Sequence, residues 1–120
     1  MKKLDAILKL AELVNDDPKP MVDDDLIGSY VIVRCRDAGV HAGYLESYEG
    51  RQCKLRKSRR LWYWKPANGA AFLSGVAAEG IDDTSKVGCR TTVLLTENCE
   101  IIVCSDKAQM SIEAANDYTP

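Results

Sequence analysis

Residues 30–36 read YVIVRCR, and this continuous run of β-branched and apolar residues is the strongest structural signal in the chain. Valine and isoleucine favour extended backbone, so the run predicts a β-strand. The residues DAG follow directly at 37–39, and small, turn-forming residues at this point predict a tight turn. The main domain is therefore expected to begin with a strand that turns back on itself.

Further short strands are expected on the C-terminal side of this turn. Residues 40–48 alternate loosely between apolar and polar, residues 49–50 predict a second turn, and residues 53–56 alternate as in a half-buried strand. A separate strand is expected at residues 59–65, where Pro66 ends it. Together these segments predict a meander of about four strands joined by tight turns.

The second half of the chain predicts two short helices and two more strands. Asn68 is placed to cap one helix, and Gly80 is placed to end it. Ser105 is expected to cap a final helix that runs to about residue 115. The two strands are expected between these helices, at residues 87–95 and 99–104, and residues 117–120 are expected to fray.

Apolar residues recur at spacings of three and four over residues 3–14, which predicts an amphipathic helix that ends before Pro18. This helix could cap the domain or pack against a second copy of the chain. The expected fold class is α+β, a small antiparallel β-sheet or partly open barrel with an N-terminal helix and two short helices. Residues 1–25 would form the N-terminal amphipathic helix and an acidic linker, and residues 26–120 a single β-rich domain.

The composition fits one small domain that does not cross a membrane. Of the 120 residues, 46% are hydrophobic and 28% are charged, and no apolar stretch approaches the length of a membrane span. The N-terminus lacks the apolar centre and the cleavage site of a signal peptide. We therefore expect a cytoplasmic protein.

The cysteines do not suggest a disulfide framework or a metal site. They are odd in number and include no C-x-x-C pair, and His41 is the single histidine. We expect no metal and no cofactor, and we expect the thiols to be reduced and buried. The five cysteines are Cys35, Cys53, Cys89, Cys99 and Cys104.

The net charge of −2 conceals an uneven distribution. Residues 51–65 carry seven basic residues and no acidic one. The first 25 residues carry four lysines and seven acids, and the last 42 carry three basic residues and eight acids. This asymmetry predicts an anion-binding patch on an acidic body. General nucleic-acid binding is not expected, because the acidic flanks would repel a polyanion.

Residues 57–64 read KSRRLWYW and are the strongest functional signal. Guanidinium groups bind phosphate through paired hydrogen bonds, and flat aromatic rings stack on bases. Strand alternation places Arg60, Trp62 and Trp64 on one side and Arg59 on the other. One side would form core and the other a ligand-binding platform. The alternative is that the aromatic residues belong to the core and that solvated arginines flank them.

Two further groups of residues could contact a phosphorylated ligand. Arg34 and Arg36 project from the same side of the first strand, a spacing that suits a diphosphate, although an ordinary exposed strand face has the same pattern. The small residues of the following turn would allow a ligand to approach the backbone. The candidate contacts in this turn are Ala38, Gly39, Val40 and His41.

Catalysis is a third possibility, with His41 as base, Cys35 as nucleophile and Asp37 as the orienting group. Strand alternation puts Cys35 and Asp37 on the side opposite to the paired arginines, and His41 lies across a turn. The sequence shows no other acid–base pair at a recognisable spacing. We therefore expect a binding protein without catalytic residues, not an enzyme.

Four segments together resemble the first type of Thoeris anti-defence protein, a family encoded by phages. They read YVIVR at 30–34, AGVHAGYL at 38–45, SRRLWYW at 58–64 and LSGVA at 73–77, and the resemblance covers roughly residues 27–105. Proteins of that family are sponges that hold cyclic ADP-ribose isomers made by the bacterial Thoeris system and do not cleave them. Members also assemble beyond dimers and hold cyclic oligonucleotide signals of the CBASS system at separate sites.

The resemblance implies a phage or prophage sponge in the cytoplasm of an infected bacterial host cell. It would sequester a cyclic ADP-ribose isomer or a cyclic di- or trinucleotide, and it would be a homo-oligomer, either a dimer or a larger assembly such as a hexamer. The alternative function is a protein-interaction module that inhibits or adapts a host protein through exposed tryptophan and arginine residues.

Overall fold

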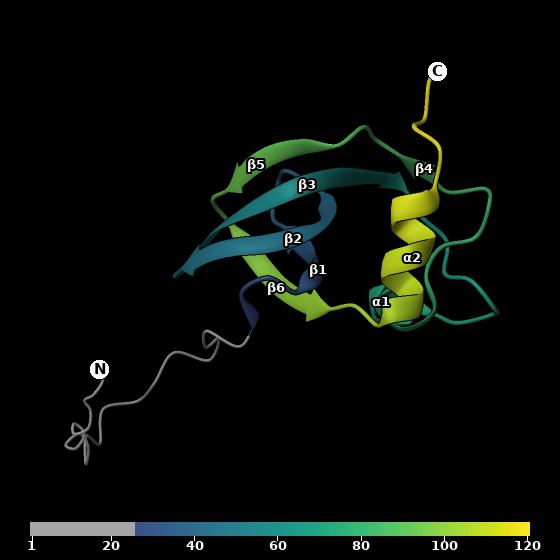
Figure 1. Ribbon diagram of the computed structural model, residues 1–120, viewed down its shortest axis with the longest axis horizontal. Helices are drawn as coiled ribbons and strands as arrows, with labels where there is room; N and C mark the ends of the chain where they lie inside the picture. Colours follow the sequence, from purple (N-terminus) through teal and green to yellow (C-terminus); the bar gives the residue numbers. More distant parts are fainter. Residues whose placement is uncertain (1–25) are drawn as a thin grey trace, which may run out of the picture.

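The computed structural model of the protein describes residues 26–120 (Figure 1). The helix expected at residues 3–14 and the acidic linker lie outside the described residues. In chain order the elements are β1 Tyr30–Cys35, β2 Val40–Glu49, β3 Gln52–Tyr63, α1 Phe72–Glu79, β4 Lys86–Val87, β5 Thr91–Leu95, β6 Asn98–Val103 and α2 Asp106–Ala114.

The strands form one six-stranded antiparallel sheet in the order β4-β3-β2-β1-β6, and β5 also pairs with β3. β5 pairs with β3 and β6 pairs with β1, so these two consecutive strands lie at opposite edges of the sheet. The sheet is open between them. Figure 1 shows α1 and α2 together at one end of the sheet, with the C-terminal segment leaving α2 at that end. The α+β class, the antiparallel sheet and the two short helices are confirmed.

Each face of the sheet carries its own group of buried apolar side chains, and β1 contributes to both because neighbouring residues of a strand point to opposite faces. The helix-side cluster packs the sheet against the two helices. Its buried members are Tyr30, Ile32, Ala42, Leu61, Leu73, Val76, Ala77, Val87 and Ile112. The opposite cluster consists of Val31, Val33, Cys35, Leu45, Cys53, Leu55 and Leu95.

The prediction of separate strands at residues 53–56 and 59–65 was wrong, because β3 runs through both. The pairing of β3 with β2 gains one residue between Arg56 and Arg59, and Lys57 there has a positive φ of 51°. A β-bulge of this kind takes up an extra residue without ending the strand. Gly43 lies opposite, where a Cβ atom would approach the Ser58 Cα to 2.9 Å.

The strand expected at residues 87–95 is divided into β4 and β5, which lie along the same edge of β3. Residues 88–90 belong to neither strand. The Gly88 N–H still donates to the Arg60 backbone carbonyl at 2.8 Å, and its carbonyl oxygen accepts a hydrogen bond of 2.8 Å from the Arg59 side chain. Regular pairing with β3 resumes at β5.

The helix boundaries were predicted in part. Ser105 caps α2 as expected, since its Oγ accepts a hydrogen bond of 3.0 Å from the Ala108 backbone N–H, and Gly80 ends α1 with a φ of 90°. Asn68 does not cap α1, whose N-cap is Ala71. Instead, the Asn68 side-chain amide donates to the Glu79 carboxylate at 2.9 Å, so it links the two ends of the segment.

Two smaller expectations also need correction. All five cysteines are free, but only Cys35 and Cys53 are buried, whereas Cys89 and Cys99 are exposed. The C-terminal residues after α2 were expected to fray, yet Asp117 and Tyr118 are held against β4 by a backbone bridge and a hydrogen bond to the Val87 carbonyl. Neither helix in residues 26–120 has the length and apolar character needed to cross a membrane.

Candidate functional site

Arg59 lies inside the protein, with 0% of its surface exposed. Its Nε donates to the Gly88 carbonyl at 2.8 Å, and its Nη1 donates to the carbonyls of Ile112 and Ala115 at 2.7 and 2.8 Å. Its Nη2 donates to the Asp117 carboxylate at 2.7 Å. These acceptors occupy most of the N–H groups of the guanidinium, so Arg59 does not face a ligand. The proposed site below does not include it.

The position of Arg59 explains how a charged group can be buried here. Ile112 and Ala115 belong to the C-terminal end of α2, where unpaired carbonyls give the helix a partial negative charge. Burial lowers the pKa of Arg59, as does the charge of Arg90, while Asp117 raises it. An arginine stays protonated in spite of such a shift. Arg59 therefore fastens α2 and the C-terminal segment to β3.

Arg60 has the opposite environment, on the other face of the same strand. Its side chain is exposed and lies against Gly39 in the turn between β1 and β2, where a Cβ atom would come within 2.6 Å of Nη2. A Cβ atom at residue 39 would displace the guanidinium from this position, and Gly39 also has a φ of 85° that favours glycine. Among residues 26–120, the Arg60 side chain has no hydrogen-bond or ion-pair partner, and its charge is available to an anion.

His41 is the cross-strand partner of Arg60 in the β2–β3 register and is 9% exposed. Its Nε2–H donates to the Ala38 carbonyl at 2.9 Å, so the ring is fixed on the turn that also carries Gly39. Burial lowers the pKa of His41; the bond to Ala38 acts against this shift, and the Arg60 charge adds to it. The structure thus brings together Ala38, Gly39, His41 and Arg60.

The other arginine pair is placed differently. Val40 pairs with Arg34 across β1 and β2, so both lie one register step from His41 and on the opposite face of the sheet. The exposed Arg34 side chain forms an ion pair with Glu100, with an Nε–Oε1 distance of 2.7 Å. Arg36 is exposed just beyond β1. The Arg34 guanidinium is therefore already paired with a carboxylate, whereas the grip on a diphosphate expected of Arg34 and Arg36 stays a prediction.

The two tryptophans of the KSRRLWYW segment separate. Trp64 is half-buried and packs against the helix-side cluster. Trp62 is 61% exposed and lies at a register shift, where Leu61 and Tyr63 pair with the adjacent residues Val87 and Lys86. Such a bulge redirects the side chain of the extra residue. The shared side that alternation predicted for Trp62 and Trp64 is lost for this reason.

Trp62 has two partners that the sequence did not indicate. The Tyr118 ring is nearly parallel to it, with ring centroids 5.8 Å apart and an interplanar angle of 14°. The Lys86 ammonium lies 5.2 Å from the centroids of both rings. We call Trp62, Lys86 and Tyr118 the aromatic triad. No sequence pattern could have found it, because its members come from three separate segments.

A small recess of about 240 Å³ adjoins the Arg60 region and shares the turn residue Ala38. Cys35, Asp37 and Glu97 also line it, with Thr96. Burial raises the pKa of Cys35, so its sulfur is a thiol at neutral pH, and it donates to the Asn98 side chain at 3.6 Å. This environment does not activate Cys35 as a nucleophile, since the reactive form is the thiolate.

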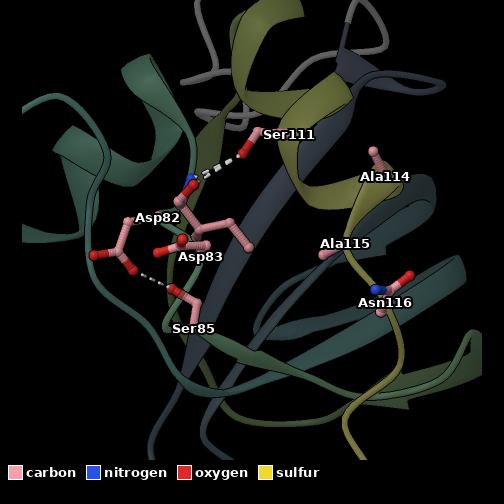
Figure 2. A pocket seen from close by; sticks show the side chains of 8 residues that line it. Asp82, Asp83, Ser85, Ser111, Ala114, Ala115 and Asn116 are labelled. Carbon is pink, nitrogen blue, oxygen red and sulfur yellow. Dashed lines mark hydrogen bonds between the residues drawn. The ribbon is translucent and has the colours of Figure 1, made fainter.

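A second recess, of about 370 Å³, lies elsewhere, between the loop after α1 and the C-terminal end of α2 (Figure 2). Figure 2 shows Asp82 and Asp83 on one side of it and Ala114, Ala115 and Asn116 on the other. Asp82 accepts hydrogen bonds from Thr84 and Ser85, which lower its pKa. The lining contains carboxylates and no basic side chain, which disfavours an anionic ligand.

Comparison with known proteins adds a family but no described activity. Residues 26–120 contain no cluster of three or more His, Cys, Asp or Glu side chains that could hold a metal ion. No curated protein and no solved structure matches the chain. The family model that matches is described as "Domain of unknown function (DUF6948)", and the match covers residues 28–112, more than half of the chain. The protein belongs to this family.

Proposed function

We propose that the protein binds and sequesters a cyclic nucleotide immune signal, a cyclic ADP-ribose isomer or a cyclic di- or trinucleotide, without cleaving it. The observation that carries the proposal is the Arg60 guanidinium, which lies over Gly39 beside the fixed ring of His41 and has no partner within residues 26–120. A phosphate at this position would receive paired hydrogen bonds from the guanidinium, and a glycine turn lets the ligand approach the backbone. The resemblance to the first type of Thoeris anti-defence protein supports the same ligand class.

Sequestration, not turnover, suits the chemistry of these residues. A sponge needs positive charge and enclosing surface, but it needs neither a nucleophile nor a general base. Cys35 is held as a thiol by burial, and the His41 Nε2–H is engaged with the Ala38 carbonyl. The region around Arg60 therefore offers contacts for binding a phosphate and no evident activated group for attacking one.

We further propose that the binding unit is a homo-oligomer in the cytoplasm of an infected bacterial cell. Neither of the two recesses described above is lined by Arg60, and carboxylates line both, so a single copy of the chain does not enclose an anionic ligand at Arg60. A second copy of the chain would supply the missing wall. The net charge of −2 and the carboxylates of Asp37 and Glu97 beside this turn would repel a long polyanion, so the proposal does not include general nucleic-acid binding.

Calorimetric titration of the purified full-length protein with cyclic ADP-ribose isomers and cyclic dinucleotides tests the proposal. We expect dissociation constants in the micromolar range or below for at least one of these ligands. Heat denaturation of the complex should then release the ligand with its mass unchanged, which separates sequestration from hydrolysis. Failure of all these ligands to bind at micromolar concentration would end the proposal, and release of a cleaved product would replace it with an enzyme.

A second candidate function is a protein-interaction module that inhibits or adapts a host protein. Phe72 favours it: the side chain is 80% exposed, and its backbone has a φ of 67°, which costs an L-residue about 1–2 kcal/mol. Packing inside residues 26–120 does not explain this conformation. A pull-down that retains one host protein in wild type and loses it in Phe72→Ser, together with the absence of nucleotide binding, would favour this function.

A further inference from the structure

We propose that Trp62 and Tyr118 hold one nucleobase of the ligand between their rings, with Lys86 beside its phosphates. The inference rests on the proposed function and adds the part of the site that recognises the base. Because Tyr118 follows α2, the inference makes the C-terminal segment part of the binding surface. The inference is argued from the aromatic triad.

The first argument is that core packing does not account for Trp62. A tryptophan that is 61% exposed leaves much apolar surface in water, although burying such surface stabilises a fold by roughly 25 cal/mol per Å². The bulge opposite β4 nevertheless turns this ring outward. Exposed aromatic rings are stacking surfaces that accept any base, because every base has a flat π-face.

The second argument is the charge around the rings. Lys86 lies 5.2 Å from the centroids of Trp62 and Tyr118, and no carboxylate within residues 26–120 forms an ion pair with it. Lys86 also lies 5.9 Å from the centroid of the Tyr63 ring. A cation without a carboxylate partner in the described residues thus lies beside the exposed pair of rings. A planar base joined to phosphates matches this combination better than an apolar ligand does.

The third argument is the way in which Tyr118 is held. Its neighbour Asp117 forms the ion pair with the buried Arg59, with an Nη2–Oδ1 distance of 2.7 Å, and the Tyr118 N–H donates to the Val87 carbonyl at 2.8 Å. The backbone of Asp117 and Tyr118 is therefore fixed to β3 and β4, while the Tyr118 ring extends from it. The two rings are stacked on each other, with centroids 5.8 Å apart and an interplanar angle of 14°. A base between them therefore requires the Tyr118 ring to move away from Trp62 by about one ring thickness, roughly 3.5 Å.

Calorimetric titration of Tyr118→Ala with the same cyclic ADP-ribose isomers and cyclic dinucleotides tests the inference. We expect the dissociation constant to rise roughly 5- to 100-fold relative to wild type, the range that corresponds to the loss of one stacked base. Tyr118→Phe keeps the ring and should bind like wild type. Tyr63→Ala is the comparison variant, because Tyr63 is an exposed tyrosine whose ring lies 5.9 Å from Lys86 but does not stack on Trp62, so its loss should weaken binding less than the loss of Tyr118.

Fluorescence provides a second readout that does not depend on affinity alone. In a Trp64→Phe background Trp62 is the only tryptophan, and its emission should change when a ligand binds. Wild-type affinity in Tyr118→Ala would overturn the inference and leave the proposed function intact. Tighter binding in Tyr118→Ala would also overturn it, by showing that Tyr118 merely covers Trp62. If the wild-type protein binds none of the ligands, both proposals fall together.

Discussion

Arg59 and Arg60 are neighbours in the sequence but have opposite environments in the structure. Arg59 is fully buried and bonded to α2, to Gly88 and to Asp117, whereas Arg60 is exposed over the β1–β2 turn without a partner in the described part of the chain. The difference arises because successive side chains of β3 point to opposite faces and only one face is covered by helices. The comparison teaches that one arginine contributes stability and the other is available for function.

The comparison is tested most strongly by Arg59→Met, which removes the charge while keeping an apolar side chain in the core. We expect the free energy of unfolding to fall by about 3–5 kcal/mol, because Asp117 and the carbonyls at the end of α2 lose their donor. Urea denaturation followed by circular dichroism measures the change. Arg60→Met is the control and should stay within about 0.5 kcal/mol of wild type. Equal losses in the two variants would show that the structural distinction is false.

The complementary change is Arg60→Ala, which should affect binding and leave stability nearly unchanged. We expect the binding free energy for a cyclic nucleotide signal to weaken by about 1.5–3 kcal/mol, the contribution of a charge-assisted hydrogen bond. Calorimetry with the tightest ligand found for wild type gives the value. Arg56→Ala is matched to it, since Arg56 is an exposed arginine of the same strand that pairs with Glu46 at 3.1 Å. Wild-type affinity in Arg60→Ala would remove this residue from the site.

Gly39→Ala displaces the Arg60 guanidinium without removing its charge, so it tests the position of the charge separately from its presence. The new methyl group would overlap the guanidinium, and the positive φ should lower the free energy of unfolding by about 1–2 kcal/mol. Gly50→Ala shares the positive φ, at 58°, but a Cβ atom there meets nothing within 4 Å. Denaturation and calorimetry on both variants should therefore show similar losses of stability, with reduced affinity in Gly39→Ala alone. Reduced affinity in both variants would count against the role of the Arg60 position.

The smallest expected effect concerns the ionisation of His41, the single histidine of the chain. Nuclear magnetic resonance titration of its ring should give a pKa below the ordinary value of 6.5, because burial lowers it and the Arg60 charge lowers it further. The pKa should rise in Arg60→Ala and stay unchanged in Arg56→Ala. A wild-type pKa at or above 6.5 would show that the two side chains are not arranged as described.

The same shift gives a sign for the dependence of stability on pH. The unfolded chain binds a proton at His41 more readily than the folded protein does, so this contribution to stability is complete above pH 6.5. It is lost as the pH falls below 6.5 toward the lower pKa of the folded state. His41→Gln should reduce this dependence in urea denaturation at a series of pH values, and an unchanged slope would assign it to other groups.

Local sequence patterns were sufficient for several elements. The run at residues 30–36 predicted β1, Ser105 predicted the start of α2, and Gly80 predicted the end of α1. Each of these signals acts through backbone preference or through a hydrogen bond to a near neighbour in the chain, and both can be recognised from adjacent residues. The division of residues 52–65 into two strands failed because a bulge and a turn have similar local sequences.

The candidate site was predictable only in outline. The sequence indicated that Arg59 and Arg60 point to opposite sides of a strand, and it indicated the small residues around Gly39. It did not indicate which side α2 would cover, because that depends on packing between segments far apart in the chain. For the same reason Lys86 and Tyr118 were missed, since neither lies near Trp62 in the sequence.

Local sequence signals were enough for β1, the end of α1, the start of α2, the α+β class and the presence of a basic aromatic segment. The tertiary structure decided which arginine is buried, which tryptophan is exposed and which distant residues surround them. The physical reason is that backbone preferences act between neighbouring residues, whereas burial and charge pairing depend on which surfaces meet when the chain folds.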